Sequence, residues 1–76
     1  MKPLSDMPVG EAAWVAALRS ADSARLERLA AYGLTPGSLV RVAQHTPTLI
    51  FLVGETEVAV DAQVAGEIMV VEVEPE

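Results

Sequence analysis

The chain contains no cysteine and only one each of histidine, tryptophan, tyrosine and phenylalanine. Without cysteine, neither disulfide bridges nor thiolate-bound metal sites can support the fold. A single histidine cannot supply the two or three imidazole ligands of a typical zinc centre. The absence of cysteine is compatible with a reducing compartment. The stability of the fold has to come from the packing of side chains in a core.

Long apolar runs are also absent. The longest run of aliphatic or aromatic residues larger than alanine, Leu49 to Val53, is far shorter than the roughly 20 residues that a membrane-spanning helix needs. The start, Met1 to Asp6, has no apolar run behind Lys2, so no secretory signal is expected. We therefore expect a soluble, cytoplasmic protein without direct membrane insertion.

Basic residues are few. Five lysines and arginines stand against eleven acids, which gives a net charge of −6. Because phosphate neutralisation dominates nucleic-acid affinity, this balance argues against DNA or RNA as a partner, and anionic membrane surfaces are disfavoured for the same reason. Ordinary solvated charges are the simplest interpretation of the arginines. Four of them could still form a local basic face: Arg19, Arg25, Arg28 and Arg41.

No motif for catalysis is present, so we predict no enzyme activity, no catalytic residues and no cofactor. His45 has only Thr46 and Thr48 nearby and is interpreted as a surface-loop residue. The Gly33 to Gly37 turn lacks the Gly-Lys-Ser/Thr ending of a phosphate-binding loop. The serines have no His-acid constellation evident in the sequence.

Acidic side chains are the remaining metal-ligand candidates. Carboxylates are hard oxygen ligands, but acids that alternate along exposed strands are usually the solvated side of a sheet. We predict no dedicated metal site and keep weak cation binding as an alternative. The acids concerned are Glu55, Glu57, Asp61, Glu72, Glu74 and Glu76.

What the sequence does have is an informative helix–turn–strand segment from Arg25 to Val42. Leu26 and Leu29 fall at helical spacing, and Gly33 follows as a residue that takes a left-handed cap conformation without steric cost. Leu34 is expected to fold back onto Leu29. The structural turn is predicted to comprise Gly33, Leu34, Pro36 and Gly37.

The 76 residues suffice for one small domain, and 51% hydrophobic content allows a core. The pattern predicts a helix from Ser23 to Tyr32, capped by Ser20 or Asp22. Residues 63–67 could form one helical turn. Five short strands are expected at 11–18, 38–44, 49–53, 57–61 and 69–74. This mainly β pattern with one inserted helix favours a small closed or nearly closed antiparallel barrel over residues 1–76.

Exposed apolar side chains are the best functional candidates. If Ala13, Val15 and Ala17 face the core, Trp14 faces out. If Leu49, Phe51 and Val53 face the core, Ile50 and Leu52 face out. Clustered exposed apolar groups are typical of protein interfaces, including those of homo-oligomers. The alternative is that Trp14 packs under the helix or a terminus, or that the strand register is reversed.

The order of motifs resembles the FeoA family, small cytosolic proteins associated with bacterial ferrous iron transport. The resemblance covers nearly the whole chain, and its most specific part is the Gly-Leu-Thr-Pro-Gly turn after an Arg-Leu helix. The matching segments are Leu4-Ser5, Pro8 to Glu11, Arg25-Leu26, Tyr32 to Gly37, Val40, Val42, Val58 to Asp61, Ala65 and Ile68.

The resemblance implies an SH3-like β-barrel and a non-enzymatic accessory role, docking on the cytosolic part of the FeoB iron transporter. Similar domains form the C-terminal module of DtxR-type iron-dependent repressors, so a regulatory domain that binds a peptide or a metal is the alternative. The acidic charge, and apolar Ile50 and Leu52 where polar residues are expected, depart from the family pattern. The candidate partner-binding residues are Trp14, Arg25, Arg28, Thr35, Ile50 and Leu52.

Overall fold

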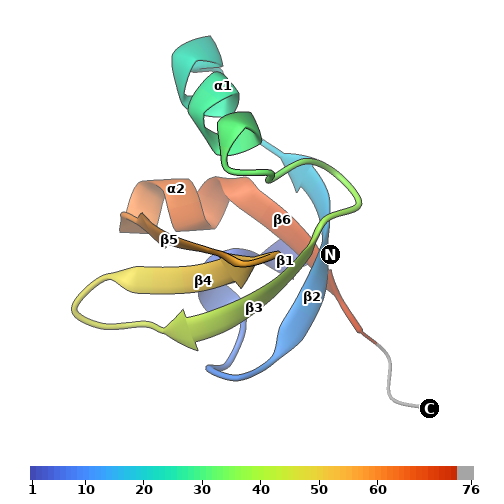
Figure 1. Ribbon diagram of the computed structural model, residues 1–76, viewed down its shortest axis with the longest axis vertical. Helices are drawn as coiled ribbons and strands as arrows, with labels where there is room; N and C mark the ends of the chain where they lie inside the picture. The colour runs from blue at the N-terminus through green and yellow to red at the C-terminus, as the bar shows by residue number, and fades with distance from the viewer. Residues whose placement is uncertain (74–76) are drawn as a thin grey trace.

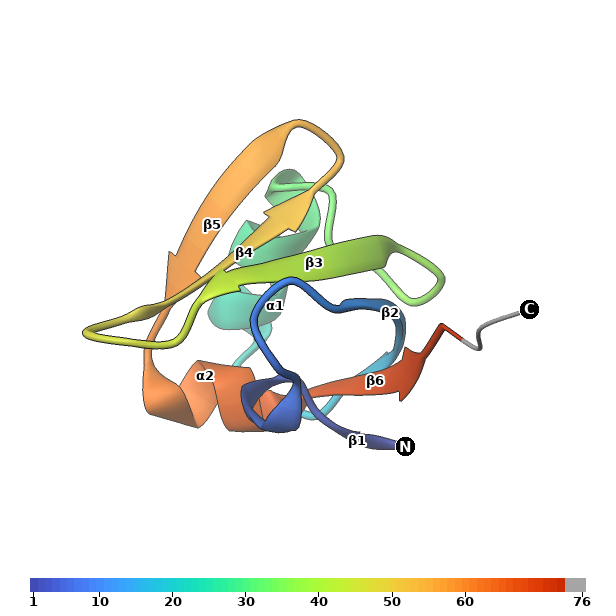
Figure 2. The same ribbon diagram turned by 90° about the horizontal axis from the view of Figure 1, so that it is seen from below.

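One antiparallel sheet forms the body of the molecule. In the computed structural model, which describes residues 1–73, the sheet has six strands in the order β1-β6-β2-β3-β4-β5. The prediction of a mainly β fold is thus confirmed. The sheet curls on itself (Figure 2). Its edge strands β1 and β5 are not paired with each other, so a closed barrel is not formed within the described residues. The strands are β1 (Lys2–Pro3), β2 (Ala12–Leu18), β3 (Leu39–Gln44), β4 (Leu49–Val53), β5 (Thr56–Val60) and β6 (Ile68–Glu72).

Within residues 1–73, three helices accompany the sheet: η1 (Leu4–Asp6), α1 (Ser23–Ala31) and α2 (Ala62–Glu67). Helix α1 projects from one end of the sheet, whereas α2 lies beside η1 (Figure 1). The sequence predicted neither β1 nor η1. It also placed the last strand too far along the chain: β6 begins at Ile68 and ends at Glu72, and Glu74 lies outside the described residues.

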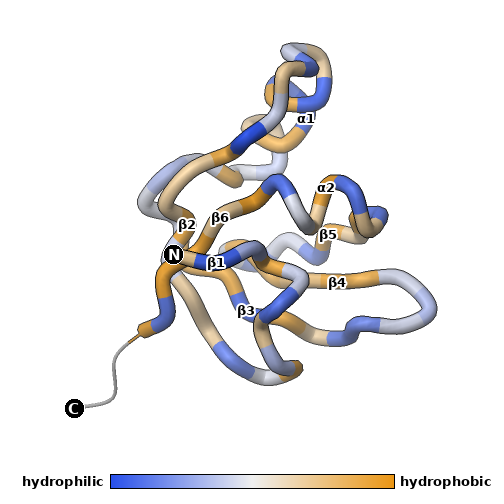
Figure 3. The backbone as a smooth tube through the Cα atoms, turned by 180° about the vertical axis from the view of Figure 1, so that it is seen from behind, coloured by the Kyte–Doolittle hydropathy of each residue, from blue (hydrophilic) through white to orange (hydrophobic). Residues whose placement is uncertain are grey.

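Buried side chains alternate with more exposed ones along the middle strands, and the buried ones form the core. Phe51, the one phenylalanine, is fully buried at the centre of β4, and Leu49 and Val53 on the same face are buried with it. Each inward residue of β4 lies opposite an inward residue of β3 or β5, so the apolar faces of the strands meet. Figure 3 shows the hydrophobic colour along β4 and a mixture of hydrophobic and hydrophilic positions along β3. The other large side chains that are fully buried are Leu4, Met7, Leu34, Ile68, Val15, Val40, Val42 and Val70.

Strand β2 departs from the predicted alternation at a β-bulge. Its register against β6 shifts between Val15 and Ala17, which leaves Ala16 as the extra residue. The predicted core face of Ala13, Val15 and Ala17 is therefore wrong at its last member. Past the bulge, Leu18 packs against the core and pairs with buried Ile68.

Helix α1 ends in a Schellman motif centred on Gly33, whose φ is +93°. The N–H of Leu34 donates to the Leu29 carbonyl at 3.0 Å, and the N–H of Gly33 donates to the Ala30 carbonyl at 2.9 Å. These bonds satisfy carbonyls that the helix end would leave open. Leu29 and Leu34 are both buried, so the helix end is fixed to the core.

The start of α1 is fixed by two contacts of a different kind. Asp22 is the N-cap, and its side chain accepts a hydrogen bond from the backbone N–H of Arg25 at 3.1 Å. The guanidinium of Arg25 pairs with Glu67 at the end of α2, with 2.9 Å between Nη1 and Oε1. Leu29 is nevertheless the only buried residue of the helix. The helix therefore stands off the sheet, held at its two ends.

The short edge strand β1 is held to β6 by an ion pair between Lys2 and Glu72. The hydrogen bond from Lys2 and its positive charge lower the pKa of the Glu72 carboxyl below its ordinary value. This edge strand is thus short, contains a proline and has a charged pair beside it. These features hinder pairing with a strand of another molecule.

Candidate functional site

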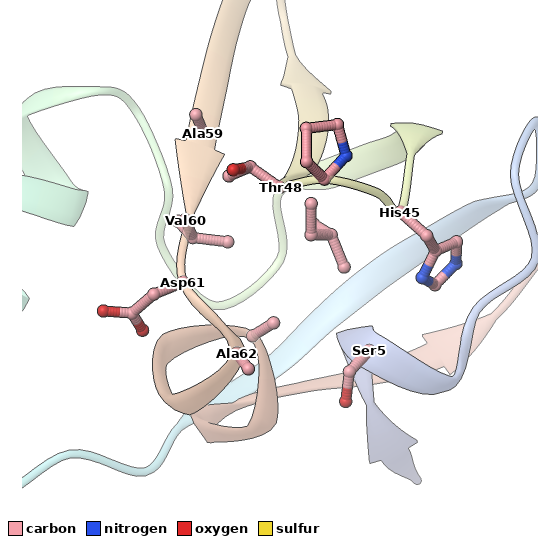
Figure 4. A pocket seen from close by; sticks show the side chains of 10 residues that line it. Ser5, His45, Thr48, Ala59, Val60, Asp61 and Ala62 are labelled. Atoms are coloured by element: carbon pink, nitrogen blue, oxygen red, sulfur yellow. The ribbon is translucent and has the colours of Figure 1, made fainter.

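One cavity lies where the loop between β3 and β4 meets η1 and the start of α2. It has a volume of about 430 Å³, and its titratable lining residues are His45 and Asp61. Figure 4 shows their side chains on opposite sides, pointing away from each other. His45 Nε2 donates to the Met7 carbonyl, and Asp61 accepts from the Val64 N–H at 2.8 Å as the N-cap of α2. Both groups thus serve local structure, and the arrangement offers no acid–base pair.

Within residues 1–73, no three His, Asp or Glu side chains gather in a way that could hold a metal ion. Two of the acids considered from the sequence, Glu74 and Glu76, lie outside the described residues.

An apolar row crosses the outer face of the sheet. Trp14 on β2 lies directly opposite Leu39 on β3 and opposite Val71 on β6. These three side chains, the outer apolar row, are 45%, 44% and 46% exposed. Trp14 therefore faces out, and the alternative in which it packs under the helix is excluded. Neighbouring exposed apolar side chains of this size are typical of protein interfaces, and tryptophan is enriched at their energetic centres.

The row continues into a shallow groove that reaches β4. This groove has a volume of about 280 Å³, and Leu52 lines it together with Leu39 and Arg41. Ile50 lies two residues before Leu52 and pairs with Gln44 and Ala59. Both Ile50 and Leu52 are half-buried. The structure thus brings Trp14 and Leu52 to one continuous face, with Ile50 farther along it.

Arg25 and Arg28 belong to a second surface. They line a groove of about 270 Å³ between α1 and β5, the helix groove, whose other lining residues are Leu29, Tyr32, Val58, Ala59, Val60, Asp61 and Val64. Arg41 instead donates to the Gly10 carbonyl and lines the groove on the outer face. The four arginines therefore do not form one basic face.

Thr35 lies in the turn that follows α1. Its backbone N–H donates to Ser38 Oγ at 3.0 Å, its hydroxyl lies 3.3 Å from the same oxygen, and Ser38 in turn donates to the Gly33 carbonyl at 3.0 Å. The Ser38 hydroxyl thus connects the two ends of the turn, and the backbone N–H of Ser38 adds a bond to the Thr35 carbonyl at 2.9 Å. The exposed side chain of Thr35 contributes to that arrangement.

Sequence reasoning missed Leu39 and Val71, which complete the row around Trp14, and Tyr32 and β5, which complete the helix groove. Leu39 alternates with buried Val40, so its exposure was readable from the period of the strand. The position of Leu39 beside Trp14 could not be predicted, because strand pairing joins residues far apart in the sequence.

Fold and surfaces together define a small SH3-like β protein that presents apolar and grooved faces. Neither α1 nor α2, the two α-helices of residues 1–73, has the length and apolar content to cross a membrane. The FeoA domain model matches residues 2–72, and the chain belongs to the FeoA family, which is linked to ferrous iron transport.

Solved structures agree with this assignment. The crystal structure of an iron uptake regulatory protein, FeoA, is 32% identical, with a TM-score of 0.81 over 93% of this chain and 95% of that one. A Stenotrophomonas maltophilia FeoA is 28% identical, with a TM-score of 0.80 over 92% of this chain and 89% of that one. It was solved with zinc and is described as a prokaryotic SH3-domain protein and a candidate activating factor of ferrous iron transport.

The same fold also occurs in metal-dependent repressors. The iron-dependent repressor IdeR of T. acidophilum is 21% identical, with a TM-score of 0.84 over 92% of this chain and 33% of that one. This likeness concerns the fold alone. No curated protein matches the chain significantly.

Proposed function

We propose that the protein is a non-enzymatic, cytosolic accessory factor that docks on the cytosolic part of the FeoB transporter and modulates ferrous iron uptake. The observation that carries this proposal is the outer apolar row, together with membership of the FeoA family. Three large apolar side chains at adjacent positions on three strands would be costly to leave in water unless a partner covers them.

The geometry supports an interface with a central anchor. Trp14 lies between Leu39 and Val71, and Arg41 and Leu52 lie farther along the same face. An aromatic residue surrounded by smaller apolar groups and a rim of charge is the usual composition of an interaction hot spot. Arg25, Arg28 and Thr35 lie on the α1 side, and they would contact a partner only if it also reaches the helix groove or the turn.

The direct test is co-purification of the protein with its cognate transporter from cells, without nucleotide and with GDP or a GTP analogue. We expect association in at least one of these states. Trp14→Glu should weaken it at least tenfold, since losses above 1–2 kcal/mol are typical of hot-spot residues. Val9→Glu is the matched control, because Val9 is exposed and lies outside the row.

Circular dichroism melting of both variants separates lost binding from lost folding. Reproducible absence of association of the wild-type protein in every nucleotide state would refute the proposal. Equal binding by the Trp14→Glu variant would move the interface away from the row. If size-exclusion chromatography shows that Trp14→Glu dissociates a homo-oligomer instead, the row mediates self-association.

A second candidate is a regulatory domain of the kind found in the C-terminal part of DtxR-type repressors, binding a peptide or a metal. The likeness to IdeR and to a manganese-dependent transcriptional repressor favours it at the level of the fold. Genetic neighbourhood separates the two: a transporter gene beside this one supports the first, and a helix-turn-helix regulator supports the second.

A further inference from the structure

The two edge strands of the sheet, β1 and β5, differ in length and in amino-acid composition. Edge strand β1 is two residues long and contains Pro3. Edge strand β5 is five residues long, Thr-Glu-Val-Ala-Val, with no proline and one charged residue, Glu57. Natural proteins usually protect long edges by proline, lysine or a bulge, because an open edge is a template for another strand. The β5 edge lacks these devices.

The hairpin geometry indicates which backbone groups of β5 are open. Strands β4 and β5 are joined by the two residues Gly54 and Glu55, so Val53 and Thr56 form the closing, hydrogen-bonded pair. Since antiparallel pairs alternate, Glu57 and Ala59 direct their N–H and C=O groups away from β4. Apart from the strand ladders, no hydrogen bond in residues 1–73 uses these groups.

The helix groove runs along this open edge. Val58, Ala59 and Val60 line it in sequence on one side, and Leu29 and Tyr32 line it from α1. Figure 1 shows α1 standing apart from β5. The apolar side chains suit alternate apolar residues of an added strand. A five-residue edge offers about 17 Å of strand, at about 3.4 Å per residue.

The charges of the groove determine what kind of strand fits. Arg25 is already paired with Glu67, and the Asp61 carboxylate is engaged as the cap of α2. Arg28 is exposed, lines the groove and has no carboxylate in ion-pair range among residues 1–73. Its guanidinium is therefore available for a charge-assisted bond to an acidic side chain. The chain as a whole is acidic, with a net charge of −6.

We propose that the helix groove binds an extended segment of a partner protein, in which apolar residues alternate with carboxylates, as an additional strand on β5. Main-chain bonds to Glu57 and Ala59 hold the segment, apolar side chains contact the Leu29 and Tyr32 wall, and a carboxylate pairs with Arg28. This site is distinct from the outer apolar row and does not depend on the transporter being the partner.

The test starts from a displayed library of random 12-residue peptides selected on the folded wild-type protein, with binding then measured by fluorescence anisotropy. We expect enrichment of alternating apolar and acidic residues. Ala59→Pro should weaken binding at least tenfold, because proline removes an outward N–H and is tolerated on an edge strand. Arg28→Glu should weaken it similarly, with Glu27→Gln, on an exposed helix position outside the groove, as the control.

N-methylation of the enriched peptide separates strand addition from other modes. Methyl groups on the alternate amides that face β5 should abolish binding, and methyl groups on the other set should not. Amide hydrogen exchange at Glu57 and Ala59 should slow at least tenfold with peptide bound. The proposal would be overturned if both sets of methyl groups abolish binding, as expected for a bound helix. It would also be overturned if neither set affects binding.

Two further results would also overturn it: no enrichment on the wild-type protein, or equal binding by folded Ala59→Pro. Because the library contains no transporter, these outcomes are independent of the co-purification test.

Discussion

Gly33 and Gly66 both border open space, but they differ in backbone conformation. Gly33 has a φ of +93° at the helix cap, whereas Gly66 lies inside α2 without a positive φ. An L-residue at Gly33 would be strained, and at Gly66 it would only restrict the unfolded chain. The same substitution should therefore have opposite effects at the two positions.

We expect Gly33→Ala to lower the free energy of unfolding by about 1–2 kcal/mol. Gly66→Ala should raise it by about 0.5–1 kcal/mol. Thermal melting followed by circular dichroism measures both, at about 4–8 °C per kcal/mol for a domain of this size. Melting temperatures that shift in the same direction would contradict the cap geometry.

At the scale of the element, α1 is the part of the fold with the least support. Only Leu29 of its nine residues is buried, and its first turn depends on the Asp22 cap and the Arg25–Glu67 ion pair. An element attached at two ends should open without unfolding the sheet.

Arg25→Gln removes the ion pair that joins α1 to α2. A partly buried pair of this kind contributes about 1 kcal/mol, so exchange of the α1 amides with solvent should accelerate about fivefold while the sheet stays protected. Hydrogen exchange followed by NMR measures this. Arg28→Gln is the control on the same helix, and equal acceleration by both variants would show that the ion pair does not hold the helix.

The elements that the sequence predicts best are those with a local cause. The stop of α1 depends on Gly33 and Leu34, and the inward faces of β3 and β4 follow from plain alternation. The bulge at Ala16 could not be predicted, because Ala16 and its neighbour Ala17 are equally small and either face tolerates them. Strand β1 was missed because its two residues are strand only by pairing with β6.

The candidate surfaces were predictable only in part, because strand pairing decides which side chains become neighbours. Trp14 could be named from its alternation with Ala13 and Val15. Its neighbours Leu39 and Val71 come from strands far along the chain, and only the pairing brings them together. The helix groove depends on how far α1 stands from β5, which no local pattern encodes.

At the scale of the whole molecule, one side chain is central to the core. Phe51 is fully buried, and the other two aromatic residues, Trp14 and Tyr32, are exposed. A chain of 76 residues is expected to have a total stability of about 4–11 kcal/mol. One large cavity could therefore remove much of that stability.

Phe51→Ala should cost about 3–5 kcal/mol, because it removes buried area and leaves a cavity. Urea unfolding followed by circular dichroism should show a strongly reduced midpoint or an unfolded chain at 25 °C. Tyr32→Ala removes an exposed aromatic ring and should change stability by less than about 0.5 kcal/mol. Similar losses in the two variants would place the centre of the core elsewhere.

The hydrogen bonds between β2 and the turn after α1 affect which parts of the protein can change in length. The N–H of Val15 donates to the Ser38 carbonyl, and the N–H of Gly37 donates to the Val15 carbonyl, so the turn that leads from α1 into β3 is bound to the middle of β2. The excursion that contains α1 can change in length at a cost of only about 0.6 kcal/mol per doubling. Evolution can thus remodel the wall of the helix groove while the face that carries Trp14 is inherited unchanged. Binding preference at one surface can diverge between relatives that keep the other.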